Sequence, residues 1–214
     1  TVSPSSEVFK FIIIGNLFAD KGHAMLLEAF AQTHTVHPSC QLHIVGDGRE
    51  RSNLEQQAEA LGVTEQVVFH GRQPRDSVRD MIQQSHCVVS ASNYETFGIT
   101  LIEAIACGVP IIATQSGGPD DIVNQHNGML IPIQDVEAMT HALKTMIQTY
   151  DQYDSEKIRQ DAVERFSQGR FVQNLVNLFT TVIEDERSWL CPRVHVNKMQ
   201  SLIVVFVHHA MLCN

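Results

Sequence analysis

The sequence predicts an α/β protein: a doubly wound parallel sheet of about six strands, with helices on both faces and a helical C-terminal part. Two observations support this fold class. Short runs rich in β-branched residues recur between residues 10 and 133, and polar or amphipathic stretches with helical spacing separate them. Nearly continuous hydrophobicity in each run is typical of parallel strands that are covered on both faces. After residue 134 the pattern becomes helical.

Six runs are expected to form the strands: "KFIIIG" (10–15), "QLHIVG" (41–46), "QVVFHG" (66–71), "CVVSAS" (87–92), "VPIIAT" (109–114) and "GMLIPI" (128–133). Three of these runs end in glycine, at Gly15, Gly46 and Gly71. In open α/β sheets the loops after the carboxyl ends of the strands form the ligand crevice. We therefore expect these glycines to line a binding site.

Amphipathic stretches predict the helices. In "KGHAMLLEAFAQTH" (21–34) the apolar side chains form one stripe, made of Met25, Leu26, Ala29 and Phe30. A glycine near the end of "ERSNLEQQAEALGV" (50–63) is typical of a helix C-terminus. Asp135 is a suitable N-cap for the first of the later helices. Those helices are expected at 135–150, 154–167 and 169–187.

No linker interrupts this pattern before residue 188, so residues 1–187 are expected to form one domain. The tail 188–214 follows no earlier pattern, and no structure is predicted for it. Its apolar stretch 201–213 is too short to span a membrane, so we expect no transmembrane segment, and no signal peptide is visible. The expected location is the cytoplasm, with peripheral contact at the inner face of a membrane left open.

Composition limits the classes of ligand. The chain has 24 acidic and 15 basic residues, a formal charge of −9, which argues against general nucleic-acid binding but allows a local basic pocket for a phosphate. The five cysteines are odd in number and lack CxxC spacing, which favours reduced thiols in a cytosolic compartment. The eleven histidines form no cluster with metal-ligand spacing, so no metal is predicted.

The segment "CVVSASNYETFGITLIEAIACG" (87–108) predicts a strand, a loop and a helix. Thr96, Phe97 and Gly98 then lie at the helix start, where free backbone N–H groups and the positive end of the dipole favour an anion. Gly98 allows a ligand to approach the backbone closely. Glu95 is expected to project from the same loop into the crevice.

Glu103 lies inside the apolar helix that follows, where a carboxylate is costly to bury without a hydrogen-bond partner. It could accept a hydrogen bond from a sugar hydroxyl, or it could pair with a buried lysine or arginine. On the residues alone the two interpretations carry similar weight.

A second loop, in "GNLFADKGHAML" (15–26), places Lys21 in the expected first turn of a helix, with Asp20 as N-cap. A lysine there opposes the helix dipole unless an anion lies beside it, although a solvated lysine is the alternative. The turn "GDG" (46–48) is not followed by a G-x-G-x-x-G pattern, and no Walker A motif is present, so neither a nicotinamide site nor a P-loop is predicted. Gly117 and Gly118 in "QSGGPDDIV" (115–123) indicate either a turn or a ligand contact.

These motifs resemble the C-terminal half of retaining glycosyltransferases of the GT-B type, family four. The stretch "ETFGITLIEAIACGVPIIAT" (95–114) is similar to that family's E-x7-E element, followed by E-A-x-A-x-G-x-P. Four further segments occur in the family's order: "GNLFADKG", "HIVGDG", "VVFHGRQP" and "SGGPDDIV". The resemblance covers residues 10–180 and implies a Rossmann-like domain that binds a nucleotide-diphosphate sugar, UDP- or GDP-linked, without metal or other cofactor.

The resemblance also implies residue roles. Glu103 would bind the ribose hydroxyls, and the backbone amides of Phe97 and Gly98 would hold the diphosphate. Glu95 would contact the donor sugar, Lys21 would neutralise the phosphates as the nucleoside diphosphate leaves, and these two side chains are the catalytic candidates, with no covalent role asserted for Glu95. The other donor-binding candidates are Gly15, Asn16, Gly46, Arg72 beside the base, Thr96 and Ile99.

The sequence departs from the family in two respects. Asn16 stands where the family usually has an arginine, so one phosphate-binding charge is missing. The family's N-terminal domain, to which the sugar or lipid-linked acceptor mostly binds, is absent from the chain and is an expected partner, and residues 1–9 would be the stump of the linker to it. The isolated chain is therefore expected to bind nucleotide and to be weakly active or inactive, with polysaccharide assembly as a plausible setting. The alternatives are a non-catalytic nucleotide-binding or interaction module and a nucleotide-sugar epimerase or phosphorylase of the same architecture.

Overall fold

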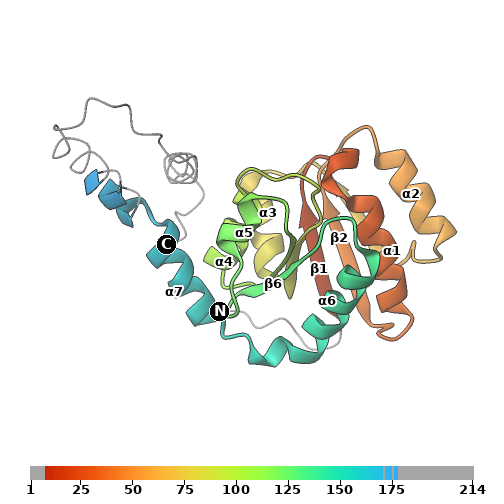
Figure 1. Cartoon of the computed structure of the whole chain (residues 1–214). Coiled ribbons are helices and arrows are strands. Elements are labelled where there is room, and N and C mark those ends of the chain that lie inside the picture. The colour runs from red at the N-terminus through yellow and green to blue at the C-terminus, as the bar shows by residue number, and fades with distance from the viewer. Residues whose placement is uncertain (1–7, 171, 175, 178–214) are drawn as a thin grey trace. The chain divides into compact units, whose positions relative to one another are not determined.

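The computed structural model describes residues 8–170, 172–174 and 176–177 (Figure 1). The chain divides into two compact units, residues 1–159 and 160–214. The first unit holds the whole sheet. In the second unit the described residues are the end of a helix, Ser155–Phe166, a bend at Ser167, and residues 168–170, 172–174 and 176–177, which are helical. The expectations for residues 1–7, 178–187 and the tail 188–214 lie outside the described residues.

The predicted parallel sheet is confirmed, with six strands in the order β3-β2-β1-β4-β5-β6. Every neighbouring pair of strands is parallel. Each strand lies within or next to a run predicted from the sequence: β1 Phe9–Ile14, β2 Cys40–Val45, β3 Val67–Gly71, β4 Cys87–Ser90, β5 Ile111–Thr114 and β6 Gly128–Ile131.

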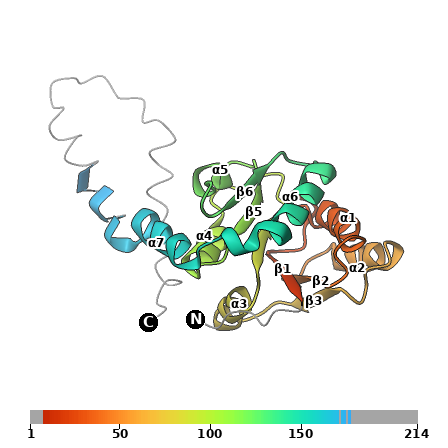
Figure 2. The same cartoon turned by 90° about the horizontal axis from the view of Figure 1, so that it is seen from below.

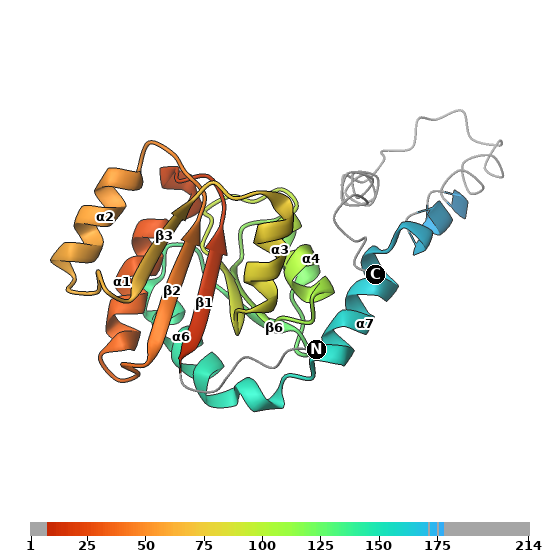
Figure 3. The ribbon, with the colours of Figure 1, turned by 180° about the vertical axis from the view of Figure 1, so that it is seen from behind.

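Helices cover both faces of the sheet, as the continuous hydrophobicity of the strands predicted (Figures 2 and 3). On one face α1 packs against α2 and α6, and on the other α4 packs against α3 and α5. Side chains of β1 alternate between the two layers: Phe11 and Ile13 join the core cluster under α1 and α6, while Ile12 is buried on the opposite side. The helices and short 3-10 turns are η1 Ala19–Lys21, α1 His23–His34, α2 Arg51–Ala60, α3 Arg75–Gln83, α4 Ile99–Ala106, α5 Gly118–Ile122, α6 Val136–Thr149, η2 Tyr150–Gln152 and α7 Ser155–Phe166.

The strand order places a topological switch point between β1 and β4. From β1 the chain proceeds to β2 and then β3 on one side, and α3 then returns it to β4 on the other side of β1. The loops that leave β1 and β4 therefore run to opposite sides and leave a crevice at the carboxyl edge between them. These are the loops that carry Lys21 and Glu95.

The start of α1 differs from the expectation. Gly22 is the N-cap, and Lys21 is the last residue of η1, so Asp20 does not cap the helix and Lys21 precedes its first turn. The reason is a close contact: Gly22 has φ 69°, and a Cβ there would collide with the carbonyl oxygen of Ala91, just past β4. Only glycine fits this turn. The other predicted N-cap, Asp135, is confirmed, because its side chain accepts a hydrogen bond from the N–H of Ala138 at 2.8 Å.

The strand-terminal glycines hold the carboxyl edge of the sheet together. The N–H of Gly46 donates to the carbonyl of Gly71 at 2.8 Å, and the N–H of Gly15 donates to that of Val45 at 2.9 Å. Gly46 has φ 140°, and a Cβ on it would overlap the carbonyl oxygen of Gly15. The local backbone packing at the edge thus requires a glycine at position 46.

Gly46→Ala is expected to destabilise the chain by on the order of 3–4 kcal/mol, because it combines a left-handed backbone with a steric collision. Gly62→Ala is the matched control: Gly62 has φ 70°, but nothing lies within 4 Å of its added Cβ, so only conformational strain of about 1–2 kcal/mol applies. Urea unfolding of both variants measures the difference. Equal losses of stability would contradict the close contact at Gly46.

Candidate functional site

A cavity of about 310 Å³ lies at the switch point, at the carboxyl ends of β1 and β4. The loops that follow these two strands and the first residues of α1 and α4 complete its wall. Apolar strand residues and mainly polar loop residues share the lining. The lining residues are Ile13, Ile14, Gly15, Asn16, Lys21, His23, Val89, Ser90, Ala91, Ser92, Glu95, Thr96, Phe97, Ile99 and Thr100.

The side chain of Glu95 joins the two loops of this site. One oxygen, Oε2, accepts a hydrogen bond from Nζ of Lys21 at 2.8 Å. The other, Oε1, accepts from the backbone N–H groups of Phe97 at 3.3 Å and Gly98 at 3.2 Å. Burial by itself would raise the pKa of Glu95, but these hydrogen bonds outweigh it and hold the pKa below its usual value. Glu95 is therefore a carboxylate at neutral pH.

The start of α4 thus binds an anion, and in the structure that anion is the chain's own Glu95 carboxylate. Gly98 is the N-cap of α4, with φ 72°, so its N–H and that of Phe97 are free of intrahelical partners. The prediction that these N–H groups favour an anion agrees with this geometry. A diphosphate that used the same two N–H groups would have to displace Glu95 from them.

Two glycines after β5 fix this loop. The N–H of Gly118 donates to the carbonyl of Glu95 at 2.6 Å, and the N–H of Glu95 donates to the carbonyl of Ser116 at 2.9 Å. A Cβ on Gly118 would lie 2.6 Å from the backbone nitrogen of Phe97. From the sequence, Gly117 and Gly118 indicated either a turn or a ligand contact. In the structure they allow the backbone of the loop after β5 to pack directly against the backbone of the loop that carries Glu95.

Glu103 lies in the middle of α4, with 21% of its side chain exposed. Its nearest cation is Nη2 of Arg75, 3.8 Å from Oε1, and the Arg75 side chain is 63% exposed. Burial raises the pKa of Glu103, and Arg75 opposes this only in part. Tight pairing with a buried lysine or arginine is thus not what the described residues show, and the carboxylate keeps the capacity to accept hydrogen bonds.

The structure brings together most of the predicted site residues. Seven of them line the cavity: Gly15, Asn16, Lys21, Glu95, Thr96, Phe97 and Ile99. Four lie outside its lining: Gly46, Arg72, Gly98 and Glu103. His23, which also lines the cavity, was not among the predicted site residues, because in the sequence it is one polar residue at a helix start with no motif that marks it. Ser90 and Ser92 were not among them either, because the sequence shows them only as the end of a strand.

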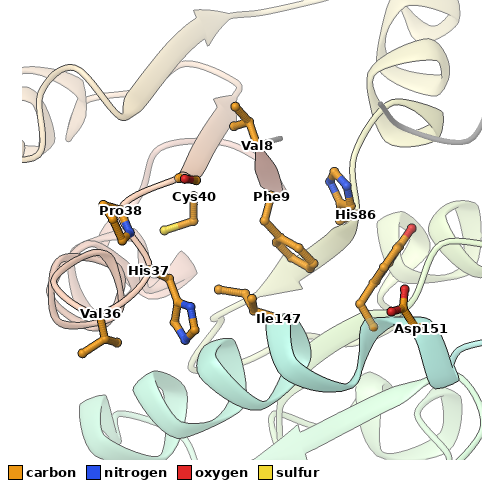
Figure 4. A pocket seen from close by; sticks show the side chains of 11 residues that line it. Val8, Phe9, Val36, His37, Pro38, Cys40, His86, Ile147 and Asp151 are labelled. Atoms are coloured by element: carbon orange, nitrogen blue, oxygen red, sulfur yellow. The ribbon is translucent and has the colours of Figure 1, made fainter. Parts of the chain in front are cut away.

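A larger cavity, of about 460 Å³, lies at the opposite edge, where β1 and β2 begin (Figure 4). Three rings on its wall pack against one another: the centroid of Phe9 lies 4.5 Å from that of His86 and 5.4 Å from that of Tyr150. Among the described residues that line it there is no lysine or arginine. It therefore offers no fixed positive charge to an anionic ligand, in contrast to the cavity beside Lys21.

Within the described part of the chain, no three histidine, cysteine, aspartate or glutamate side chains lie together as a metal site would require. The same part of the chain has no helix with the length and apolarity that crossing a membrane needs.

Residues 3–165 match the family model described as glycosyl transferases group 1, and the chain belongs to this family. Its fold is of the GT-B type, and it has the size of a C-terminal domain of such an enzyme.

Curated relatives agree with this assignment. The chain is 29% identical over 187 residues to N-acetyl-alpha-D-glucosaminyl L-malate synthase of Bacillus anthracis, a match that covers 86% of this chain and 48% of the relative. It is 33% identical over 135 residues to the lipopolysaccharide core biosynthesis glycosyltransferase LpsE of Rhizobium meliloti, covering 63% of this chain and 38% of the relative. The chain thus spans about half or less of the length of these relatives.

Solved structures share the fold. The lipopolysaccharide outer core galactosyltransferase WaaB superposes with a TM-score of 0.75 at 25% identity, over 84% of this chain and 51% of that one. Anabaena HepE, in complex with UDP and glucose, gives 0.72 at 24% identity, over 82% and 49%. The C-terminal domain of the group 1 protein LpcC from Francisella tularensis gives 0.61 at 25% identity, over 72% of this chain and 80% of that domain.

Lys21→Met is expected to raise the pKa of Glu95, because the burial that opposes ionisation remains while the strongest stabilising hydrogen bond is lost. Carboxyl ¹³C chemical shifts followed by NMR during a pH titration measure this pKa. Arg75→Met is the matched control: it should raise the pKa of Glu103 and leave that of Glu95 unchanged. A Glu95 pKa that does not respond to Lys21→Met would rule out the ion pair in solution.

Proposed function

We propose that the chain is the donor-binding domain of a retaining glycosyltransferase that uses a nucleotide-diphosphate sugar without a metal or other cofactor. One observation carries the proposal: Lys21 and the start of α4 meet through the Glu95 carboxylate beside one cavity, at the switch point of a group 1 glycosyltransferase fold. The HepE structure, which holds UDP and glucose, supports a nucleotide donor for the same fold. The nucleotide that carries the sugar is proposed to be UDP or GDP.

Charge stabilisation is the chemistry that this arrangement can supply. When the bond between the anomeric carbon and the phosphate oxygen breaks, its electron pair goes to the oxygen, and Lys21 lies where it can neutralise that charge. The acceptor hydroxyl attacks the same face of the sugar and passes its proton to the departing phosphate. No covalent role is proposed for Glu95. Its role in the proposal is to accept hydrogen bonds from the sugar.

The proposal requires Glu95 to change partners. As the diphosphate takes the N–H groups of Phe97 and Gly98, the Glu95 carboxylate turns away from them and becomes available to the sugar. Lys21 and Glu95 have 28% and 22% of their side chains exposed, so neither is fully enclosed by the surrounding protein. The diphosphate replaces the carboxylate as the anion at the helix start.

Glu103 suits the ribose. It is half-buried and its pKa is raised, so a partner that donates hydrogen bonds to its carboxylate would relieve part of the cost of burial. Because Glu103 lies outside the lining of the 310 Å³ cavity, the nucleoside is proposed to lie along α4, beyond the cavity's rim, with the exposed Arg72 on the side of the base.

Asn16 makes the donor site depend on a single cation. Lys21 is the one lysine or arginine among the described residues that line the cavity, and Asn16 lines it where the family usually has an arginine. This favours a second candidate function, a nucleotide-binding module with little or no turnover. Sugar transfer by the chain, once combined with an acceptor-binding domain, separates the two functions.

The whole protein's acceptor, location and partners are proposals as well. Because the chain spans about half of its relatives, we propose that an N-terminal domain of the GT-B type holds a sugar or lipid-linked acceptor. We propose a cytoplasmic location. The proposed setting is the assembly of a polysaccharide or glycolipid, because the LpsE relative is named for lipopolysaccharide core biosynthesis.

Calorimetric titration of the chain with UDP and with GDP tests the donor site. One of the two nucleotides is expected to bind, and Lys21→Met and Glu103→Ala should each weaken binding by about tenfold or more, since each removes a charged hydrogen-bond partner. Lys157→Met is the matched control, because Lys157 is 78% exposed on α7 and pairs with Asp154. Binding that neither site variant changes, or no binding of either nucleotide, would refute the proposal.

A further inference from the structure

His23 is a buried polar group in the donor cavity for which the proposed chemistry gives no role. It is the first residue of α1, lines the cavity and is only 3% exposed. Its Nδ1 and Nε2 are both buried, and neither has a hydrogen-bond partner among the described residues. A neutral imidazole carries one donor and one acceptor, and leaving both unpaired inside a protein destabilises the fold. Such an unpaired buried group needs an explanation, and beside a cavity a bound ligand is one that the site offers.

The backbone fixes the position of His23. Gly22 turns in a left-handed conformation directly against the carbonyl of Ala91, which presses the start of α1 onto the end of β4. The residues that share the lining with His23 include the fully buried Val89 and the buried Ile13, so this part of the lining lies deep in the protein. Neither nitrogen is accessible to water in this structure, so a ligand reaches the ring only when the side chain turns toward the cavity that the residue lines.

The charge state of His23 limits the kind of partner. Burial lowers its pKa to about 4, and the nearby Lys21 acts in the same direction while Asp20 opposes it. The ring is therefore neutral at pH 7 and supplies no countercharge for a phosphate, a role that Lys21 already fills.

Hydrogen-bond chemistry then distinguishes two parts of the donor. Phosphate oxygens only accept hydrogen bonds and would satisfy one ring nitrogen, whereas sugar hydroxyls both donate and accept and can satisfy the two. We infer that His23 is a specificity-determining residue whose ring hydrogen-bonds to hydroxyl groups of the donor's sugar. This inference rests on the proposed function.

Calorimetry on the full chain tests it, with UDP, GDP, UDP-glucose, UDP-N-acetylglucosamine and GDP-mannose as probes. His23→Leu should weaken binding of the preferred nucleotide sugar by about tenfold while leaving its nucleoside diphosphate within about twofold. The variant should also melt at a higher temperature, because an apolar side chain replaces two unpaired polar atoms. His23→Asn, which keeps a donor and an acceptor, should retain part of the sugar's contribution and carries the test if the leucine variant does not fold.

His34→Leu is the matched control. His34 ends the same helix, its Nδ1 is also buried and unpartnered among the described residues, and it does not line the cavity. This variant should gain stability without any change in binding. Unchanged affinity of His23→Leu for the nucleotide sugar would overturn the inference, and an equal loss for sugar and diphosphate would overturn the assignment to the sugar. If the unaltered chain binds none of the five probes, the proposed function itself fails.

Discussion

The hydrogen-bonded ion pair between Lys21 and Glu95 is the interaction on which the site depends. It joins residues 74 positions apart, in the loops that leave β1 and β4 on the two sides of the switch point. The N–H of Asn93 donates to the carbonyl of Asp20 at 2.8 Å and joins the same two loops a second time. Through Glu95 the pair extends to the N–H groups at the start of α4, so a lysine, a carboxylate and a helix terminus form one electrostatic unit. The pair is partly buried, and its importance is that it fixes two loops around one cavity.

Close backbone contacts make this arrangement possible. Gly22 lies against Ala91, Gly46 against Gly15, and Gly118 against Phe97, and in each case a side chain would collide with a neighbouring backbone. The carboxyl edge of the sheet is therefore built from backbones packed together, with few side chains between them. The consequence for function is that backbone N–H groups and polar loop side chains lie beside the cavity together with apolar strand side chains, a mixed lining that is typical of ligand sites. The amino-terminal edge is different, since interlocked rings line its cavity and the described lining there lacks a positive charge.

The sequence was sufficient for the fold and for much of the site, because both follow from rules that act over short distances. Alternating apolar runs and amphipathic stretches determine a parallel sheet, and the carboxyl-edge rule places Lys21 and Glu95 near each other without any coordinates. What could not be predicted depends on tertiary contacts. Glu95 accepts hydrogen bonds from N–H groups of its own loop, whose backbone is held by the hydrogen bond from Gly118. The exposed partner of Glu103 is Arg75 on α3, a helix whose bounds were not predicted from the sequence. Gly22 replaced Asp20 as the N-cap because of Ala91, which is remote in sequence. His23 was missed because its burial comes from the same contact.

The most direct test of the central claim, that the switch-point cavity is the donor site, is NMR mapping of the ¹⁵N-labelled chain with UDP and with GDP. The account predicts that one nucleotide shifts the backbone signals of Asn16, Lys21, Phe97 and Gly98, at the loops after β1 and β4, and leaves those of Phe9 and His86 unchanged. Shifts confined to Phe9, His86 and their neighbours at the opposite edge, or no shifts with either nucleotide, would contradict it.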